Sequence, residues 1–171
     1  MQAWKMFIPW MWTLHLLGAV WLSAGVLSSA VVFAQLKRTD GDLIGRAFGL
    51  RLAARLMAVF VVPGVLFTGA LGFYLLRLFG MARDFSLGTW VSFPNWLKLS
   101  LLLYLILLAG ILFIQLPQIR RAARAAEASR AAGAPTPELR AVEGVKLPAI
   151  LTHVNATLVF ILILLMAFKP F

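Results

Sequence analysis

Apolar residues form four runs along the chain, each long enough to cross a bilayer as a helix. The runs extend from about Phe7 to Ala34, Leu56 to Leu76, Trp96 to Leu116 and Leu147 to Phe168. A hydrocarbon layer of roughly 30 Å takes about 20 helical residues, whereas the strands of a membrane barrel alternate apolar and polar residues over about half that length. The pattern therefore predicts an all-α integral membrane protein, a single domain over residues 1–171 folded as a four-helix bundle with up-down-up-down topology.

The basic residues predict how this bundle is oriented. The connectors at 35–55 and 117–146 carry most of the lysine and arginine, and the other side holds only Lys5, Arg77, Arg83, Lys98 and Lys169. By the positive-inside rule, both connectors are cytoplasmic and both termini lie outside a bacterial inner membrane. The first run is about twice the length of a signal-peptide core, so we expect it to be retained.

The connector at 117–146 is rich in alanine and arginine up to Ala132 and then breaks at Gly133-Ala134-Pro135. Span 3 is therefore expected to continue as a helix beyond the membrane before a turn. Such a basic helix is suited to contact with anionic headgroups, and docking of a cytoplasmic partner is the alternative. The segment Gly41 to Leu56 mixes apolar residues with arginine, which indicates an interfacial lead-in to span 2.

Composition excludes several classes of protein. Of the 171 residues, 62% are hydrophobic and 13% are charged, a balance too apolar for a soluble domain. Cysteine is absent, so disulfides, iron–sulfur clusters and thioether-linked haem are excluded. The six acidic residues lie outside the apolar runs, which excludes carboxylate pairs within the membrane. The net charge of +10 resides mainly in the connectors, so we expect the lipid bilayer, and no nucleic acid, as a partner.

Only two ionisable side chains, His15 and His153, lie deep within the runs, and such residues are functional candidates by default. His15 shares one helix face, predicted to point into the bundle, with Gly18, Leu22, Gly25 and Ser29. A neutral imidazole on this face is suited to be an axial ligand of a b-type haem. Gly18, one turn away, leaves room for a flat macrocycle or a neighbouring helix. The alternatives are an interhelical hydrogen bond and copper binding through Met11 and His15.

His153 is the second candidate ligand, with a satisfied polar contact as its alternative. A rise of about 1.5 Å per residue puts His15 roughly 12 Å below the outer face and His153 roughly 9 Å from the inner one. Because about 9 Å then separates their levels in a 30 Å core, two separate sites fit better than one haem between both.

Other polar and small residues are expected near these histidines. Tyr104 and Thr68 fall at the level of His15 and are candidate neighbours. In the second span, Gly64, Thr68 and Gly72 form a stripe for close packing or for a cofactor cavity, and Pro63 is predicted to kink the helix. Lys98, just after Trp96, is suited to pair with a haem propionate. The alternative is that the two residues anchor the span at the membrane interface.

The run WTLHLLGAVWLSAG in span 1, the WLK that opens span 3 and the terminal KPF resemble the HemJ-type protoporphyrinogen oxidases and the copper-resistance-D-like membrane domains. The stretches VPGVLFTGALGF and LPQIRRAARAA are also similar to a family of uncharacterised bacterial integral membrane proteins. The resemblance implies haem b held by His15, with Gly25 and Lys98 as further matched positions. The arginine and second histidine of the oxidases are replaced by the neutral run Val26 to Phe33, so it supports haem binding more than porphyrinogen oxidation.

The leading interpretation is a bacterial inner-membrane b-type haem protein acting in electron transfer or redox chemistry, as a carrier or as one subunit of a larger redox complex. The alternative is a cofactor-free accessory subunit of a membrane complex. A porphyrinogen oxidase and a copper-handling protein rank below both.

Overall fold

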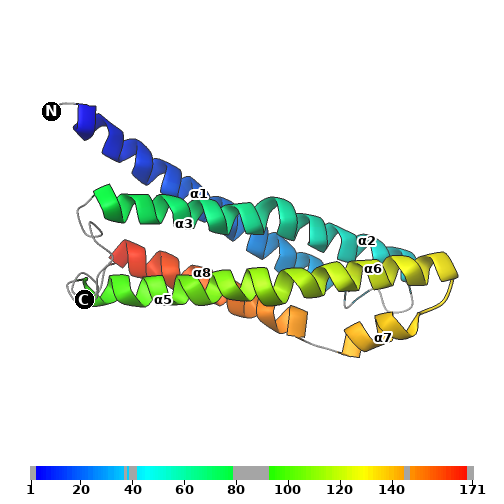
Figure 1. Ribbon diagram of the computed structural model, residues 1–171. Coiled ribbons are helices and arrows are strands. Elements are labelled where there is room, and N and C mark those ends of the chain that lie inside the picture. The colour runs from blue at the N-terminus through cyan, green and yellow to red at the C-terminus, as the bar shows by residue number, and fades with distance from the viewer. Residues whose placement is uncertain (1–2, 37, 39–41, 79–92, 145–146, 169–171) are drawn as a thin grey trace.

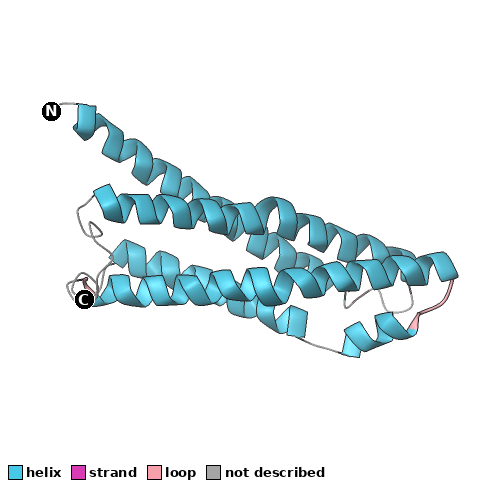
Figure 2. Cartoon of the chain, in the orientation of Figure 1, coloured by secondary structure: helices cyan, strands magenta, loops and turns pink. Residues whose placement is uncertain are grey.

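The computed structural model describes residues 3–36, 38, 42–78, 93–144 and 147–168, and within them nearly all of the backbone is helical (Figures 1 and 2). The first run is α1 (Ala3–Leu36). The second is α2 (Leu43–Leu56) and α3 (Val62–Leu78), joined by a π-helical turn at Met57–Val61. The third is α5 (Asn95–Ala109) and α6 (Leu116–Ala132), joined by a π-helical turn at Gly110–Gln115. A short helix, α7 (Pro137–Gly144), precedes α8 (Leu147–Phe168). Four helices in the described residues are long and apolar enough to cross a membrane, which confirms the predicted fold class.

The helices follow the up-down-up-down order, so that α1 begins and α8 ends at the same end of the bundle (Figure 1). Helix α1 is central: it packs along α3 on one side and along α8 on the other, and α8 in turn packs against α5. Helices α3 and α5 contact each other only over a short stretch. Most of the loop expected between the second and third runs, at 79–92, lies outside the described residues.

Charged residues limit the part of each long helix that can lie in hydrocarbon. Residues 56–76 lie between Arg55 and Arg77, and residues 99–119 lie between Lys98 and Arg120, so each charge-free segment has 21 residues. At a rise of about 1.5 Å per residue both measure about 31 Å, the thickness of a bilayer core. Beyond these segments, α2 and α6 continue together for about 20 Å. We call this part, with α7, the extension.

Prolines account for the two π-helical turns. Pro63 follows the first turn by two residues and Pro117 follows the second by two. A proline inside a helix has no N–H, and its ring clashes with the carbonyl four residues earlier. Widening the preceding turn moves that carbonyl away while the helix continues. The distortion predicted at Pro63 is thus a π-helical turn.

The extension has a small core of its own. Ala47 of α2, Ala125 and Ala126 of α6 and Leu139 of α7 are buried together. Gly133 caps the end of α6, and its φ of 68° is the left-handed conformation that glycine adopts without strain.

A hydroxyl pair holds α7 against α6. The Thr136 amide donates to Ser129 Oγ at 3.0 Å, and the two hydroxyls are 2.9 Å apart. Thr136 Oγ1 in turn accepts from the Leu139 amide at 3.4 Å, so Thr136 caps the first turn of α7. The apolar runs alone did not predict this helix.

Glycines bring α1 and α3 into backbone contact. A Cβ added to Gly64 of α3 would lie 2.9 Å from Leu22 Cα, and one added to Gly25 of α1 would lie 3.1 Å from the Val61 nitrogen. An added Cβ this close to backbone atoms would force the helices to shift, so α1 and α3 approach as closely as glycine permits. Small residues at spacings of three and four on both helices make this approach possible.

Replacing Gly64 by valine should therefore force α1 and α3 apart. We expect the loss of stability of an overpacked core, about 1–3 kcal/mol, measured by thermal unfolding of the protein in detergent. The matched control is Gly110→Ala, because the nearest atom to its added Cβ is Asn155 Oδ1 at 4.0 Å. Equal melting temperatures for Gly64→Val and the wild type would contradict the backbone contact.

Candidate functional site

His15 lies inside the bundle, 8% exposed, on the α1 face that the sequence predicts to point inward. The other positions of that face, Gly18, Leu22, Gly25 and Ser29, are buried as well. His15 Nδ1 is 3.0 Å from the carbonyl oxygen of Thr68 in α3. A carbonyl oxygen only accepts, so Nδ1 carries the proton and donates it, and the neutral ring keeps its lone pair on Nε2.

The approach of the imidazole to Thr68 depends on Gly72, one helical turn further along α3. A Cβ added to Gly72 would lie 3.0 Å from His15 Cε1 and 3.5 Å from Nδ1. In a helix the carbonyl of one residue points toward the residue four positions later, so a side chain that reaches Thr68 must pass over residue 72. The small-residue stripe predicted in span 2 thus provides the carbonyl and the bare surface beside it.

Gly18 does not face open space. A Cβ at Gly18 would lie 2.7 Å from Thr68 Oγ1 and 3.0 Å from the ring of Phe67. The sequence left open whether a macrocycle or a neighbouring helix would lie against Gly18. In the structure, α3 lies against it. Thr68 Oγ1 is buried without a hydrogen-bond partner.

Tyr104 of α5 repeats the arrangement of His15 at the preceding turn of α3. Its hydroxyl donates to the Val65 carbonyl at 2.8 Å. Gly69, four residues after Val65, leaves the space that the hydroxyl occupies, since an added Cβ would lie 1.9 Å from it. Tyr104 thus sits one turn of α3 from Thr68, as its predicted level implied. This bond joins α5 to α3, which otherwise contact each other little.

The structure does not bring the remaining predicted site residues to His15. His153 is exposed on α8, and the hydroxyl of Thr157 donates to its carbonyl at 3.0 Å. Lys98 lies in the first turn of α5, where its amide donates to the Pro94 carbonyl at 3.2 Å. Gly25 packs against Phe60 and Val61. Among the described residues, no three histidine or carboxylate side chains cluster where they could hold a metal ion.

Sequence reasoning missed a second buried polar group. Gln115 Nε2 donates to Thr152 Oγ1 at 2.9 Å, and the Asn155 side-chain amide donates to Gln115 Oε1. All three side chains are buried, and they join the second π-helical turn to α8. The Gln115 amide thus bonds to both α8 side chains and clamps the two helices together. The signal in the sequence was a glutamine and an asparagine inside apolar runs.

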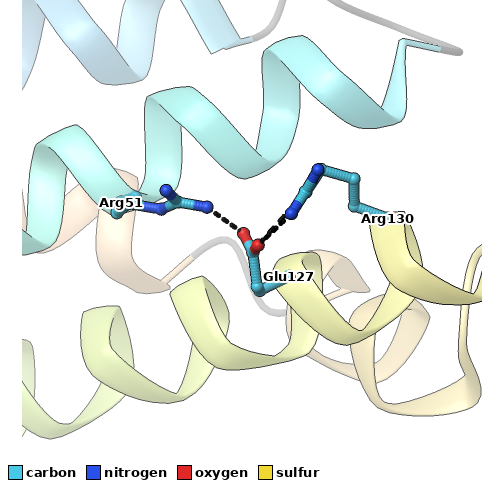
Figure 3. A network of polar contacts seen from close by, with 3 residues as sticks. All are labelled: Arg51, Glu127 and Arg130. Carbon is cyan, nitrogen blue, oxygen red and sulfur yellow. Dashed lines mark hydrogen bonds and ion pairs between the residues drawn. The ribbon is translucent and has the colours of Figure 1, made fainter.

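The extension carries a charged contact between α2 and α6 (Figure 3). Glu127 of α6 accepts from the Arg130 guanidinium at 2.5 and 3.1 Å and also pairs with Arg51 of α2. The hydrogen bonds from Arg130 and then Arg51 favour the ionised carboxylate and lower the pKa of Glu127 below its ordinary value of 4.5. The contact is exposed, so solvent screens it, and it orients the two helices more than it stabilises them.

Fold and site together define a four-helix integral membrane protein with one buried histidine clamped to a backbone carbonyl. The chain belongs to the family described as predicted integral membrane protein (DUF2269), which matches residues 10–170. This bears out the predicted similarity to an uncharacterised membrane family. No curated protein and no solved structure matches the chain.

Acid should loosen the contact between α2 and α6. A carboxylate whose pKa is lower in the folded than in the unfolded protein stabilises the fold fully at pH values above the unfolded-state pKa. This contribution is lost as the pH falls through the folded-state pKa. At neutral pH, the amides of Leu43–Leu56 should be better protected from exchange in the wild type than in Glu127→Gln, which lacks the contact at every pH. We expect this difference to disappear as the pH falls below about 4.5. Hydrogen exchange of both proteins across this range measures the difference. Glu138→Gln, on the exposed surface of α7, is the control and should behave as wild type.

Proposed function

We propose that the protein is a membrane-embedded b-type haem protein acting in electron transfer, with His15 as an axial ligand of the iron. The observation that carries this proposal is the hydrogen bond from His15 Nδ1 to the Thr68 carbonyl. Metal-ligating histidines commonly donate their second ring N–H to such an acceptor, which fixes the tautomer and raises the basicity of the other nitrogen. Nε2 is then the atom suited to bind iron.

The surroundings of His15 fit this chemistry in part. The imidazole is buried and fixed between α1 and α3, and Gly72 leaves one side of the ring without a side chain. The contact between Gly18 and Thr68 fills the space one turn away, so a macrocycle would have to bind on the Nε2 side of the ring. When bound, haem supplies a one-electron redox centre whose potential depends on its ligands and their hydrogen bonds. Thr68 and Gly72 would act as positioning residues.

The level of His15 narrows the choice of electron partner. His15 lies beside Gly72, five residues from Arg77, and thus roughly 8 Å inside the end of the bundle where α3 ends. The extension begins at Arg55, about 26 Å away along the same helix. A redox partner would therefore reach the site from within the membrane, or from the side opposite the extension.

The second candidate is a cofactor-free accessory subunit, and the contact between Gly18 and Thr68 favours it. In that case, the hydrogen bond from His15 to Thr68 serves to hold α1 against α3, and the helices pack without any group between them. The two functions predict different spectra, so one experiment separates them.

The test is the dithionite-reduced minus oxidised spectrum of the purified full chain, with a pyridine haemochrome assay, after expression with ample haem. We expect about one haem b per chain in the wild type and a loss of about tenfold or more in His15→Ala, because the ligand to iron is removed. His153→Ala is the matched control, since this histidine is exposed on α8, and it should keep its haem.

Two outcomes would contradict the proposal, the first its haem and the second its ligand. A colourless wild type that is folded and monodisperse would leave the accessory subunit as the function. A wild-type haem content in His15→Ala would remove His15 as the ligand. Gly72→Val adds a positioning test: its side chain should displace the imidazole and reduce haem content, while Gly110→Ala should not.

A further inference from the structure

The extension presents apolar side chains on an outer face of α2. Ile44, Phe48 and Leu52 follow one another at intervals of four residues and are 71%, 66% and 37% exposed. Arg55 continues the same face and is also exposed. We call these four residues the α2 ridge. The opposite face of α2 is occupied, because Ala47 and Ala53 are buried against neighbouring helices.

Most of the α2 ridge lies beyond the reach of lipid. Helices α2 and α3 continue one another along one axis (Figure 1), and Arg55 marks the end of the charge-free segment. Phe48 is seven residues past Arg55 and Ile44 is eleven, which places them about 10 and 16 Å beyond the hydrocarbon. The headgroup layer is only about 5–7 Å thick on each side. Acyl chains therefore cover Leu52 at most.

The charge of the extension specifies what can cover the ridge. Residues 42–55 and 120–140 contain eight arginines and three carboxylates, a net charge of +5. Glu127 is shared between Arg51 and Arg130, so it offsets only part of this charge. A second copy of this chain, related by a two-fold axis along the membrane normal, would set Arg55 against its own equivalent. Like charges across an interface are costly, so self-association through the ridge is disfavoured.

We propose that the α2 ridge is the docking site for an acidic amphipathic helix of a partner protein on the extension side of the membrane. The apolar side chains of the ridge recur once per helical turn. They can therefore pack against a second helix that presents apolar residues at spacings of three and four. Acidic residues flanking that stripe would meet Arg51 and Arg55. The proposal stands on the extension alone and does not depend on haem at His15.

The experiment is photo-crosslinking of the full chain in its native membrane, with Phe48→p-benzoyl-phenylalanine as the probe. We expect a covalent adduct with one protein, and mass spectrometry should find its crosslinked peptide to be acidic and amphipathic. Phe113, 78% exposed and seven residues inside Arg120 in the charge-free segment, is the matched control position and should label lipid only. Ile44→p-benzoyl-phenylalanine provides a second probe on the ridge.

Charge reversal tests the electrostatic part of the proposal. Arg55→Glu should reduce the yield of the Phe48 adduct by about tenfold, because it sets a like charge against the acidic partner. Arg140→Glu, exposed on α7, should leave the yield unchanged. The proposal is overturned by an adduct with phospholipid alone, by one with a second copy of this chain, by one with a basic peptide, or by labelling no greater than at Phe113.

Discussion

The close contact between α1 and α3 is the constraint on which the rest of this structure depends. Lipid offers helices little hydrophobic reason to associate, so their attraction must come from backbone proximity and polar bonds. Here, Leu22 packs against Gly64 and Val61 packs against Gly25, and these two contacts fix the antiparallel register of α1 and α3. The same register places His15 beside Gly72. A shift of one residue would turn the imidazole away from the Thr68 carbonyl. The hydrogen bond of His15 therefore depends on the packing of α1 against α3.

Helix α3 binds polar side chains in a way that follows from helix geometry. Thr68 is followed four residues later by Gly72, and Val65 by Gly69. Each carbonyl has a second lone pair, and each glycine leaves it accessible from outside the helix. His15 of α1 binds one of these carbonyls and Tyr104 of α5 binds the other. The three helices are therefore joined through consecutive turns of α3, without any charge inside the bilayer.

Much of the fold could be read from the sequence because bilayer physics constrains it strongly. Long apolar runs predicted the four spans, and the spacing of His15, Gly18 and Gly25 predicted the inward face of α1. The partners of that face could not be predicted, because the relative height of two helices depends on how their side chains interlock. Leu139 and α7 were missed for another reason: their cluster of four residues, three of them alanines, gives no long apolar run.

The two ends of the molecule present different side chains, and α2, the first π-helical turn and α3 connect them as one helix. At one end, α3 holds His15 through Thr68, well inside the span. At the other end, α2 exposes Arg55 at the end of the charge-free segment and Phe48 about 10 Å further along the helix. The π-helical turn before Pro63 lies between them, and there the backbone is least regular. A partner bound to α2 would thus contact the helix that holds the histidine, yet would lie too far away to contact a group bound at His15. The proposed docking site and the proposed haem site thus lie near opposite ends of one membrane-spanning helix.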